Sequence, residues 1–426
     1  MLPLIKLLIL ADDLTGAVDT GVQLAKQDVF THVTVEANAD IPSLDPDLQV
    51  LVVDTESRHD SAREAGRKVG KIVSSARRCG VKTFYKKTDS TLRGNVGAEL
   101  EAALHASGED VLAFVPAYPK AERFTRGGFQ YIGGTLLHRT GFGEDPLEPA
   151  TTSHIPDILK RQTGCALSSV SLDALRSGRN VPFRKRGIVV FDCDHEDDLS
   201  RIGEWLTGKN MLRMMAGSAG FAEKLPGLLR MPRMVRKRTV TAGPVLIVNG
   251  SLNEVSIRQV AWAEKNGLPV VTLSPSLWAQ PDPRGNDEWA RTLDRVGVEL
   301  RAGRDIAIRT MAEAEAPRGS LVGQGIPGQA GDLYRRVAQR VGALVSDILQ
   351  NPACGTCAVF GGDTLRGVMN ALSVSGIRPI LEIAPGTVLS EVSEPSRRLH
   401  LVTKAGGFGG EGVVFQIIQF IREGSE

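Results

Sequence analysis

Residues 4–16 read Leu-Ile-Lys-Leu-Leu-Ile-Leu-Ala-Asp-Asp-Leu-Thr-Gly, an apolar run that stops at two adjacent carboxylates. The run over 4–11 is too short for a helix and predicts a buried strand. A helical pattern follows, in which Val18, Val22 and Ala25 fall on one face. A strand, a polar turn and a helix in this order are typical of an α/β sheet with parallel strands.

The same alternation continues along the chain. Short runs rich in Leu, Ile and Val recur at 49–54, 111–115, 187–191, 244–248, 356–360 and 398–403, and helical patterns such as 60–79 and 329–347 lie between them. Strands that alternate with helices form parallel sheets that helices cover on both faces. The sequence therefore predicts an α/β fold with mostly parallel sheets flanked by helices.

The length of 426 residues is enough for two or three domains. Residues 231–243 are basic and weakly periodic and precede a strong strand, so we place a solvated linker there, with a phosphate-attracting patch as the alternative. The predicted organisation is an N-terminal domain over 1–232, a linker over 233–243 and a C-terminal domain over 244–426. Clefts between domains commonly bind ligands, and we expect the active site in such an interdomain cleft.

The composition argues against a protein that binds nucleic acid or an anionic membrane. Lys and Arg number 51 and Asp and Glu 49, a net charge of +2, so no broad field of one sign exists. The five cysteines are too few and too scattered for a disulfide framework, and a reducing cytoplasm is the expected compartment. No segment approaches the ~18 consecutive apolar residues of a membrane span, and the N-terminus lacks the pattern of a signal peptide.

Polar residues follow the first two predicted strands. Asp12 and Asp13 stand at the carboxyl end of the first strand, where open parallel sheets bind ligands. A helix N-cap is the alternative role for either acid. Arg58 follows the second strand and could pair with a carboxylate through both arms of its guanidinium, or form a plain surface ion pair.

The segment 86–94, Lys-Lys-Thr-Asp-Ser-Thr-Leu-Arg-Gly, packs cations, hydroxyls and one carboxylate into nine residues. Such a set suits a small polyhydroxylated anion, because the cations pair with its carboxylate and Asp89 can accept a proton from a reacting hydroxyl. A cluster of caps and turns is the alternative. Residues 116–147 predict a long irregular stretch, which we interpret as a lid or a substrate wall.

Three glycine turns follow strands in the second half: Asn249-Gly-Ser251, Gly361-Gly-Asp-Thr364 and Lys404-Ala-Gly-Gly-Phe-Gly409. Each leads toward a helix, whose first N–H groups attract anions. Three such turns in one domain resemble a cradle for nucleotide phosphates, although glycine also serves turn geometry alone. No Walker-type sequence, His-Glu-x-x-His or nucleophile elbow occurs.

Two patterns are decoys. Residues 323–328 fit G-x-G-x-x-G, but Pro327 stands where a helix would begin and no acidic partner follows at the expected distance. Cys354 and Cys357 have the spacing of a redox or zinc pair, but no second pair exists and the nearest histidine is His400. We therefore expect structural cysteines and no dinucleotide fold.

Together, five motifs resemble the four-carbon acid sugar kinase family over nearly the whole chain. They are Ala11–Gly16, Lys87–Gly94, Asn249–Ser251, Gly361–Thr364 and Lys404–Gly409. Within that family, residues 19–25 are most similar to the D-threonate kinases. The resemblance implies an N-terminal domain that binds a sugar acid, a C-terminal domain that binds ATP, and transfer of phosphate to the terminal hydroxyl at carbon 4.

The resemblance also implies which residues form the two sites. The positions that match acid binding are Asp12, Arg58, Lys87, Thr88, Asp89 and Ser90. Those that match ATP binding are Ser251, Gly361, Gly362, Asp363, Thr364 and Gly407.

The chemistry of phosphoryl transfer supports this division, because the reaction needs positioning, charge neutralisation and a base more than covalent catalysis. We expect Asp12 or Asp89 to orient and deprotonate the hydroxyl, and Arg58 and Lys87 to hold the substrate carboxylate. Glycine-loop N–H groups and Mg²⁺ would neutralise the phosphates, with Asp363 as a candidate metal contact and the other metal ligands left open.

Three other functions compete with this one. The same chemistry on D-erythronate or 3-oxo-tetronate differs only in local hydrogen-bond geometry at the substrate. A non-catalytic sensor of sugar acid or nucleotide would bind without turnover. A nicotinamide-dependent oxidoreductase is the third, which the missing acidic partner disfavours. A homodimer is an open expectation, because dimers are the commonest soluble assemblies.

Overall fold

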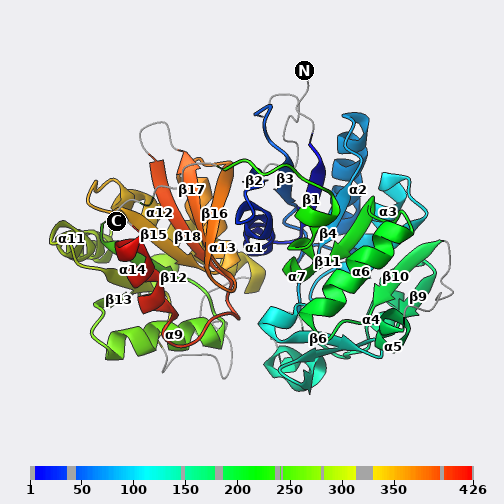
Figure 1. The fold of residues 1–426 in the computed structure, drawn as a ribbon. Coiled ribbons are helices and arrows are strands. Elements are labelled where there is room, and N and C mark those ends of the chain that lie inside the picture. Colours follow the sequence, from blue (N-terminus) through cyan, green and yellow to red (C-terminus); the bar gives the residue numbers. More distant parts are fainter. Residues whose placement is uncertain are drawn as a thin grey trace. The chain divides into compact units, whose positions relative to one another are not determined.

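In this computed structural model, the described residues are 5–35, 45–144, 149–177, 186–235, 240, 243–279, 283–312, 330–393 and 398–424. The chain divides into two compact units, Met1–Arg236 and Lys237–Glu426. Each unit contains a sheet whose strands alternate with helices (Figure 1). The predicted α/β class is therefore confirmed.

The first unit is built on a parallel sheet. Its strands are β1 (Leu7–Ala11), β2 (Thr31–Thr34), β3 (Val50–Asp54), β4 (Phe84–Lys87), β5 (Val111–Val115), β9 (Leu167–Val170), β10 (Gly187–Phe191) and β11 (Met214–Gly217). Their order is β2-β3-β1-β4-β11-β5-β10-β9, and every neighbouring pair is parallel. The strands predicted at 4–11, 49–54, 111–115 and 187–191 all exist, because each buries its apolar run completely or nearly so.

Helices cover this sheet on both faces. The helices are α1 (Leu14–Ala25), α2 (Ala62–Arg78), α3 (Val96–Ser107), α4 (Ile155–Lys160), α5 (Leu172–Arg176), α6 (Glu196–Gly208), α7 (Ala219–Ala222) and α8 (Leu225–Leu228). On one face, α2 and α3 pack through residues such as Val73 and Leu100 against Leu8, Leu10 and other strand residues. Helix α1 contacts β1, β2, β3 and β4, and the side chain of Asp13 caps its first turn through Gly16 N at 2.9 Å.

The stretch 116–147, predicted to be irregular, contains a small antiparallel sheet instead. Its strands are β6 (Arg123–Arg126), β7 (Phe129–Ile132) and β8 (Thr135–Leu136). Gly127 and Gly128 have positive φ angles of 58° and 76°, which gives the tight turn that a two-residue hairpin requires. The glycines were therefore turn signals between short strands and not evidence of a loop. The end of the predicted stretch, at 145–147, lies outside the described residues.

The sheet of the second unit is parallel in one part and antiparallel in the other. Its strands are β12 (Val245–Asn249), β13 (Val270–Thr272), β14 (Ile306–Arg309), β15 (Thr356–Phe360), β16 (Gly376–Ala384), β17 (Thr387–Ser393) and β18 (Arg398–Lys404). Strands β13-β14-β12-β15-β18 run parallel, whereas β17 pairs antiparallel with both β18 and β16. Strands β16 and β17 follow each other directly, and Gly386 turns the hairpin with φ 70°.

The helices of the second unit are α9 (Glu254–Lys265), α10 (Ser276–Ala279), α11 (Asp287–Arg301), α12 (Ala330–Leu349), α13 (Gly362–Ala371) and α14 (Val413–Glu423). Helices α9 and α14 pack on one face of the sheet, against residues such as Val245 and Ile247. The backbones of α12 and α13 touch at Gly342 and Gly367, where a Cβ on either residue would collide with a carbonyl of the other helix.

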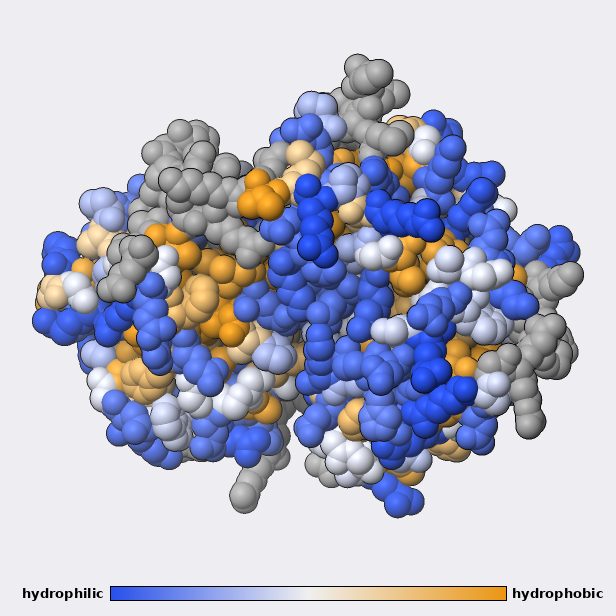
Figure 2. Space-filling view, viewed as in Figure 1, coloured by the Kyte–Doolittle hydropathy of each residue, from blue (hydrophilic) through white to orange (hydrophobic). Residues whose placement is uncertain are grey.

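On the face that Figure 2 shows, the described residues are mostly hydrophilic, with hydrophobic residues scattered between them. Among the described residues, the large hydrophobic side chains classed as exposed are Phe129, Val235 and Val298. No helix in the described ranges combines the length and the apolar character that a membrane span needs. All five cysteines are free thiols, in agreement with the prediction that they form no disulfide framework.

Candidate functional site

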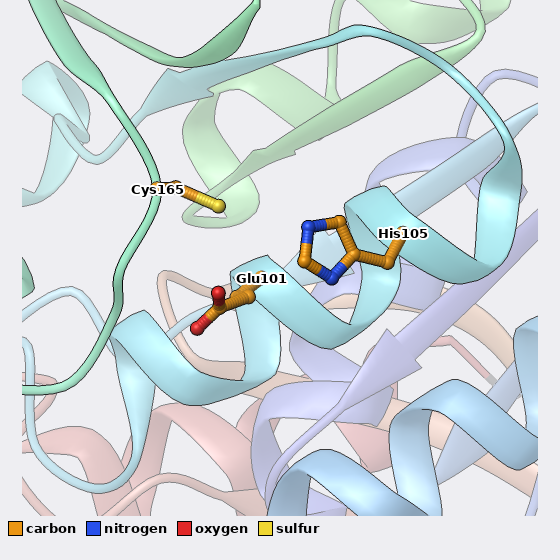
Figure 3. Close-up of side chains that lie close together, drawn as sticks. All are labelled: Glu101, His105 and Cys165. Atoms are coloured by element: carbon orange, nitrogen blue, oxygen red, sulfur yellow. The ribbon is translucent and has the colours of Figure 1, made fainter.

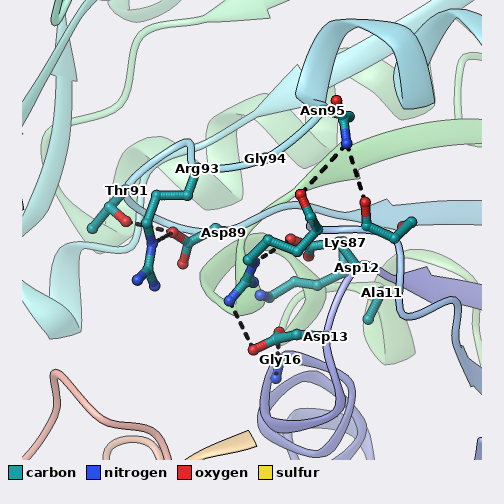
Figure 4. Close-up of polar contacts among 12 residues, drawn as sticks. Ala11, Asp12, Asp13, Gly16, Lys87, Asp89, Thr91, Arg93, Gly94 and Asn95 are labelled. Atoms are coloured by element: carbon teal, nitrogen blue, oxygen red, sulfur yellow. Dashed lines mark hydrogen bonds and ion pairs between the residues drawn. The ribbon is translucent and has the colours of Figure 1, made fainter. Parts of the chain in front are cut away.

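The register of the first sheet brings three predicted segments to one edge. Ala11 pairs with Asp54 on one side and with Lys87 on the other, so β1, β3 and β4 end at the same level. The residues that follow these strands are therefore neighbours although they are far apart in the sequence. Asp12, Arg58 and the run from Lys87 to Ser90 meet there, as Figure 4 shows for the labelled residues among them.

Arg58 holds both acids that follow β1. Its Nε donates to Asp12 Oδ2 at 2.7 Å and its Nη1 donates to Asp13 Oδ2 at 2.8 Å. Asp13 also accepts from Gly16 N and Thr15 Oγ1, so it is both a helix cap and an ion-pair partner. The capping role expected as the alternative for the acid pair therefore belongs to Asp13, and a role of Asp12 in the site stays a prediction.

The loop that carries Arg58 is fixed by backbone contacts. Asn95, which precedes α3, donates from Nδ2 to the carbonyl oxygens of Ser57 and Asp60 at 3.1 and 2.9 Å. The N–H groups of Ser57 and Arg58 donate to the carbonyl of Asp12. Arg58 is consequently held at both its backbone and its guanidinium, and its Nη2 atom makes no hydrogen bond or ion pair with the described residues.

Asp89 lies in a separate ion pair of the same site. Its Oδ2 accepts from Arg93 Nε at 2.6 Å and from Thr91 Oγ1. Burial alone would raise the pKa of Asp89, but the charges of Arg93 and Arg58 and these hydrogen bonds outweigh it and hold the pKa well below its usual range. A carboxylate with a low pKa is a weak base, so this arrangement favours orienting a hydroxyl over deprotonating it.

Asp12 is the more available acceptor. Burial raises its pKa, but the charges of Arg58 and Lys86 outweigh burial and leave the pKa lowered. Its second oxygen, Oδ1, is buried and makes no hydrogen bond with any residue that the structure describes. Thr88 Oγ1, one residue beyond the end of β4, is also buried and unpaired. Buried polar atoms are normally paired, so the two atoms mark a place for a polar ligand or water.

Lys87 supplies a cation beside these unpaired atoms. The side chain of Lys87 is 4% exposed, and its Nζ makes no hydrogen bond or ion pair with the described residues. It lies close to α1, because a Cβ on Gly16 would come within 3.0 Å of Lys87 Nζ. Ser90, three residues after Lys87, is also buried. Its backbone carbonyl accepts a hydrogen bond from Gln130 Nε2 of β7 at 2.9 Å.

A buried ion pair behind this edge was not predicted from the sequence. Lys86 Nζ lies 3.0 Å from Glu99 Oε2, and both side chains are buried. Ser57 Oγ also donates to the carboxylate of Glu99, and Thr55 Oγ1 lies 2.6 Å from Ser57 Oγ. Burial raises the pKa of Glu99. The signal in the sequence was Glu99 itself, three residues after Val96 on the apolar face of α3, where a carboxylate needs a buried partner.

In the second unit the three glycine turns converge on Ser251. A Cβ on Gly361 would lie 3.2 Å from Ser251 Cβ, and a Cβ on Gly406 would lie 3.1 Å from Ser251 Oγ. Thr364, near the start of α13, packs against Gly250. Loops after β12, β15 and β18 therefore form one cluster, because these three strands are adjacent and parallel.

The first turn of α13 has no side-chain cap. The N-cap residue Gly361 makes no side-chain hydrogen bond to the first turn, which leaves the N–H groups of Gly362 and Asp363 without a capping side chain. Asp363 is exposed, and Gly407 in the third turn is half-buried. All six residues that the resemblance implies for ATP binding thus lie in or beside the three converging loops.

Cys354 and Cys357, together with one further group, lie outside both clusters. The two cysteines are buried and form no disulfide, whereas residues 323–328 fall outside the described residues. Glu101, His105 and Cys165 offer three ligand atoms within 4.8 Å of one another; Figure 3 shows Glu101 and His105 on helix α3 and Cys165 on a neighbouring segment. None of the predicted site residues belongs to this group.

Comparisons with known proteins identify family models that match both parts of the chain. A family model described as a sugar-binding N-terminal domain matches residues 7–225, and one described as a nucleotide-binding C-terminal domain matches residues 246–414. A D-threonate kinase of Salmonella typhimurium is 33% identical over 98% of this chain and 99% of its own length. A D-threonate kinase of Bordetella bronchiseptica is also 33% identical, over 97% of each chain.

More distant relatives extend the likeness. A D-erythronate kinase of Heliobacterium modesticaldum is 27% identical over 97% of this chain and 96% of its own length. A crystal structure from Salmonella typhimurium has a similar fold, with a TM-score of 0.78, 20% identity and coverage of 97% and 98% of the two chains. The family models over most of the chain and the relatives at 33% identity confirm what the motifs predicted: the chain belongs to the four-carbon acid sugar kinase family.

Proposed function

We propose that this protein is an ATP-dependent kinase that phosphorylates the terminal hydroxyl of a four-carbon sugar acid, converting D-threonate to 4-phospho-D-threonate. The two relatives at 33% identity over nearly the whole chain, both named D-threonate kinase, support this substrate. The free thiols and the even charge balance agree with a cytoplasmic enzyme of carbohydrate acid catabolism. A homodimer stays a prediction.

One observation carries the proposal for the first unit: a cation and two unpaired, buried oxygens lie at the ends of adjacent strands. Among the described residues, Lys87 Nζ has no hydrogen-bond or ion-pair partner, and Asp12 Oδ1 and Thr88 Oγ1 have no hydrogen-bond partner. A sugar acid presents one carboxylate and several hydroxyls, so it can satisfy a cation, an acceptor and a hydroxyl at once. An apolar ligand would leave all three unpaired.

The residues then have distinct roles. Lys87 and the unpaired Nη2 of Arg58 pair with the substrate carboxylate. Asp12 accepts the proton of the reacting hydroxyl at Oδ1, because Arg58 already occupies Oδ2. Asp89 accepts hydrogen bonds from Arg93 and Thr91. It orients a substrate hydroxyl or the guanidinium of Arg93, and it is the weaker candidate for the base.

The loops of the second unit fit the phosphate groups of a nucleotide. The uncapped N-terminus of α13 and the glycine turns around Ser251 present backbone N–H groups, which bind phosphate in many nucleotide sites. Mg²⁺ usually keeps several waters and takes one or two carboxylates besides the phosphates. The exposed Asp363 at the start of α13 can supply one such carboxylate, so the residues present fit this ion. When bound, Mg²⁺ neutralises charge on the phosphates.

An assay of ADP release with ATP, Mg²⁺ and a panel of sugar acids tests the proposal. The panel contains D-threonate, D-erythronate and 3-oxo-tetronate, because relatives carry kinase names for all three. Mass spectrometry identifies the phosphorylated product. Faster turnover on D-threonate supports the proposal, whereas turnover on another acid keeps the kinase and replaces the substrate. Binding of sugar acid and ADP without any product would indicate a sensor instead.

A further inference from the structure

Lys404 is a buried lysine that has no acidic partner among the described residues. It ends β18 and is 0% exposed. Its Nζ lies 3.0 Å from Ser256 Oγ, 3.1 Å from the carbonyl of Ala405 and 3.1 Å from the carbonyl of Gly406, and 5.1 Å from the centre of the Phe360 ring. Burying an amine costs free energy, so a lysine held only by neutral groups needs a reason beyond local stability.

The two carbonyls give that reason, because they set the direction of the loop. In a trans peptide the C=O and the following N–H point in opposite directions. The carbonyls of Ala405 and Gly406 point toward Lys404 Nζ, so the N–H groups of Gly406 and Gly407 point away from it. Neither N–H donates a hydrogen bond to a described residue. Lys404 thus turns two successive donors outward.

Helix α9 holds the same loop through two of its side chains. Ser256 Oγ donates to the carbonyl of Gly406 at 3.0 Å, and Gln259 Nε2 donates to the carbonyls of Phe408, Gly409 and Gly410. The outward N–H groups lie in the cluster around Ser251, since Gly406 approaches Ser251 Oγ. Consecutive N–H groups fixed in this way make a concave site for an anion.

We propose that Lys404 is a positioning residue for the nucleotide phosphates: it holds the carbonyls of Ala405 and Gly406 inward so that the N–H groups of Gly406 and Gly407 face a phosphate. This inference rests on the proposed kinase function and adds a residue to it. Lys404 does not contact the phosphate, because its amine is fully buried against β15 and α9. The common role of a lysine near phosphate, a direct charge contact, is therefore not its role here.

The test compares Lys404→Met with Ser256→Ala in the full-length protein. Methionine keeps a stem of similar length and removes the donor. We expect the Kd for ADP, measured by calorimetry, to rise by about tenfold or more in Lys404→Met, because the donors lose their preorganisation. The Kd for adenosine, which has no phosphate, and the Kd for D-threonate should change by less than about twofold.

Ser256→Ala distinguishes positioning from direct contact. Ser256 forms hydrogen bonds with Lys404 Nζ and with the carbonyl of Gly406. Its replacement should therefore raise the Kd for ADP, but by less than Lys404→Met does. The loss of binding free energy in the double variant should be smaller than the sum of the losses in the two single variants. A direct contact between Lys404 and phosphate predicts additive effects. Ser256→Ala also tests the inference if Lys404→Met fails to fold.

The outcomes separate this inference from the proposed function. If the wild-type protein binds ADP and Lys404→Met binds it equally well, Lys404 does not position the loop and the inference is overturned. Equal weakening of adenosine and ADP would overturn it too, because the defect would not concern the phosphates. If the wild-type protein binds no nucleotide, the proposed kinase function fails, and the inference fails with it.

Discussion

Arg58 Nε donates to Asp12 Oδ2 at 2.7 Å, which joins the loop after β3 to the end of β1. The contact occupies one oxygen of Asp12 and leaves Oδ1 without a partner. It also keeps the pKa of Asp12 low, so the carboxylate is ionised at neutral pH and directed by the guanidinium. Under the proposed function, the ion pair leaves a single acceptor atom of Asp12 for the substrate.

Asp12→Asn should reduce kcat by about 100-fold or more, because it removes the acceptor of the hydroxyl proton. The Kd for ADP should stay within about twofold, since Asp12 belongs to the sugar-acid unit. Steady-state kinetics and calorimetry measure the two effects. Asp13→Asn is the matched control, because asparagine caps helices as well as aspartate and the change should lower turnover far less. Equal losses in the two variants would contradict the role of Asp12.

Asp89→Asn should also reduce turnover while leaving ADP binding nearly intact, because Arg93 and Thr91 lose their charged partner. The pKa of Asp89 is far below neutral, so its charge does not change between about pH 5 and 8. The ratio of wild-type to variant kcat/KM should accordingly be constant over this range. A ratio that grows with pH near neutrality would identify Asp89 as a titrating general base. Unchanged turnover would exclude Asp89 from the site.

Lys86→Met should destabilise the protein by about 3–5 kcal/mol, because it leaves Glu99 as an uncompensated buried charge. The double variant Lys86→Met with Glu99→Leu should recover part of this loss, since both charges are then absent. Urea unfolding followed by circular dichroism measures the free energies. Additive losses in the double variant would mean that the two side chains contribute independently.

Gly16→Ala should raise the KM for the sugar acid. The added Cβ would collide with Asp13 Oδ1 and lie 3.0 Å from Lys87 Nζ, so it displaces both the helix cap and the free cation. Gly70→Ala in α2 is the matched control, because its Cβ would meet only ordinary contacts. In a helix interior that change should stabilise the protein by about 0.5–1 kcal/mol and leave KM unchanged. An unchanged KM in Gly16→Ala would argue that Lys87 does not bind the substrate.

Lys404 should make the stability of the protein depend on pH above neutrality. Burial lowers the pKa of Lys404 to about 7, and the groups around it, namely Ser256, Phe360 and two carbonyls, carry no charge. In the unfolded chain a lysine has a pKa of about 10.4, so between about pH 7 and 10 the unfolded state binds more protons. The stability of wild type relative to Lys404→Met should therefore rise across this interval and be flat below it.

Urea unfolding of the two proteins at a series of pH values measures this difference. If the difference is the same at pH 6 and pH 9, Lys404 stays charged in the folded protein, and its three acceptors outweigh its burial. Phe360 pairs with Lys404 in the register of β15 and β18. Its side chain has no titratable group, so it does not contribute to the pH dependence.

Several elements could be predicted because their signals are local. The runs at 49–54 and 356–360 became β3 and β15, since a short run of apolar residues between polar turns can be buried only as a strand. The hairpin of β16 and β17 was missed, because Arg378 and Pro379 interrupt its apolar pattern. The sheet of β6, β7 and β8 was missed because its strands are short and its glycines resemble those of a loop.

The sequence by itself determined the α/β class, the polar residues at the strand ends and, through its motifs, the family. These depend on patterns within a few residues of one another. Only the tertiary structure decided which partners the charged groups have: Arg58 with Asp12, Lys86 with Glu99, and Lys404 with no acid among the described residues. Those pairings join segments that the sheet register aligns, and hydrogen bonds act over about 3 Å of space without regard to distance along the chain.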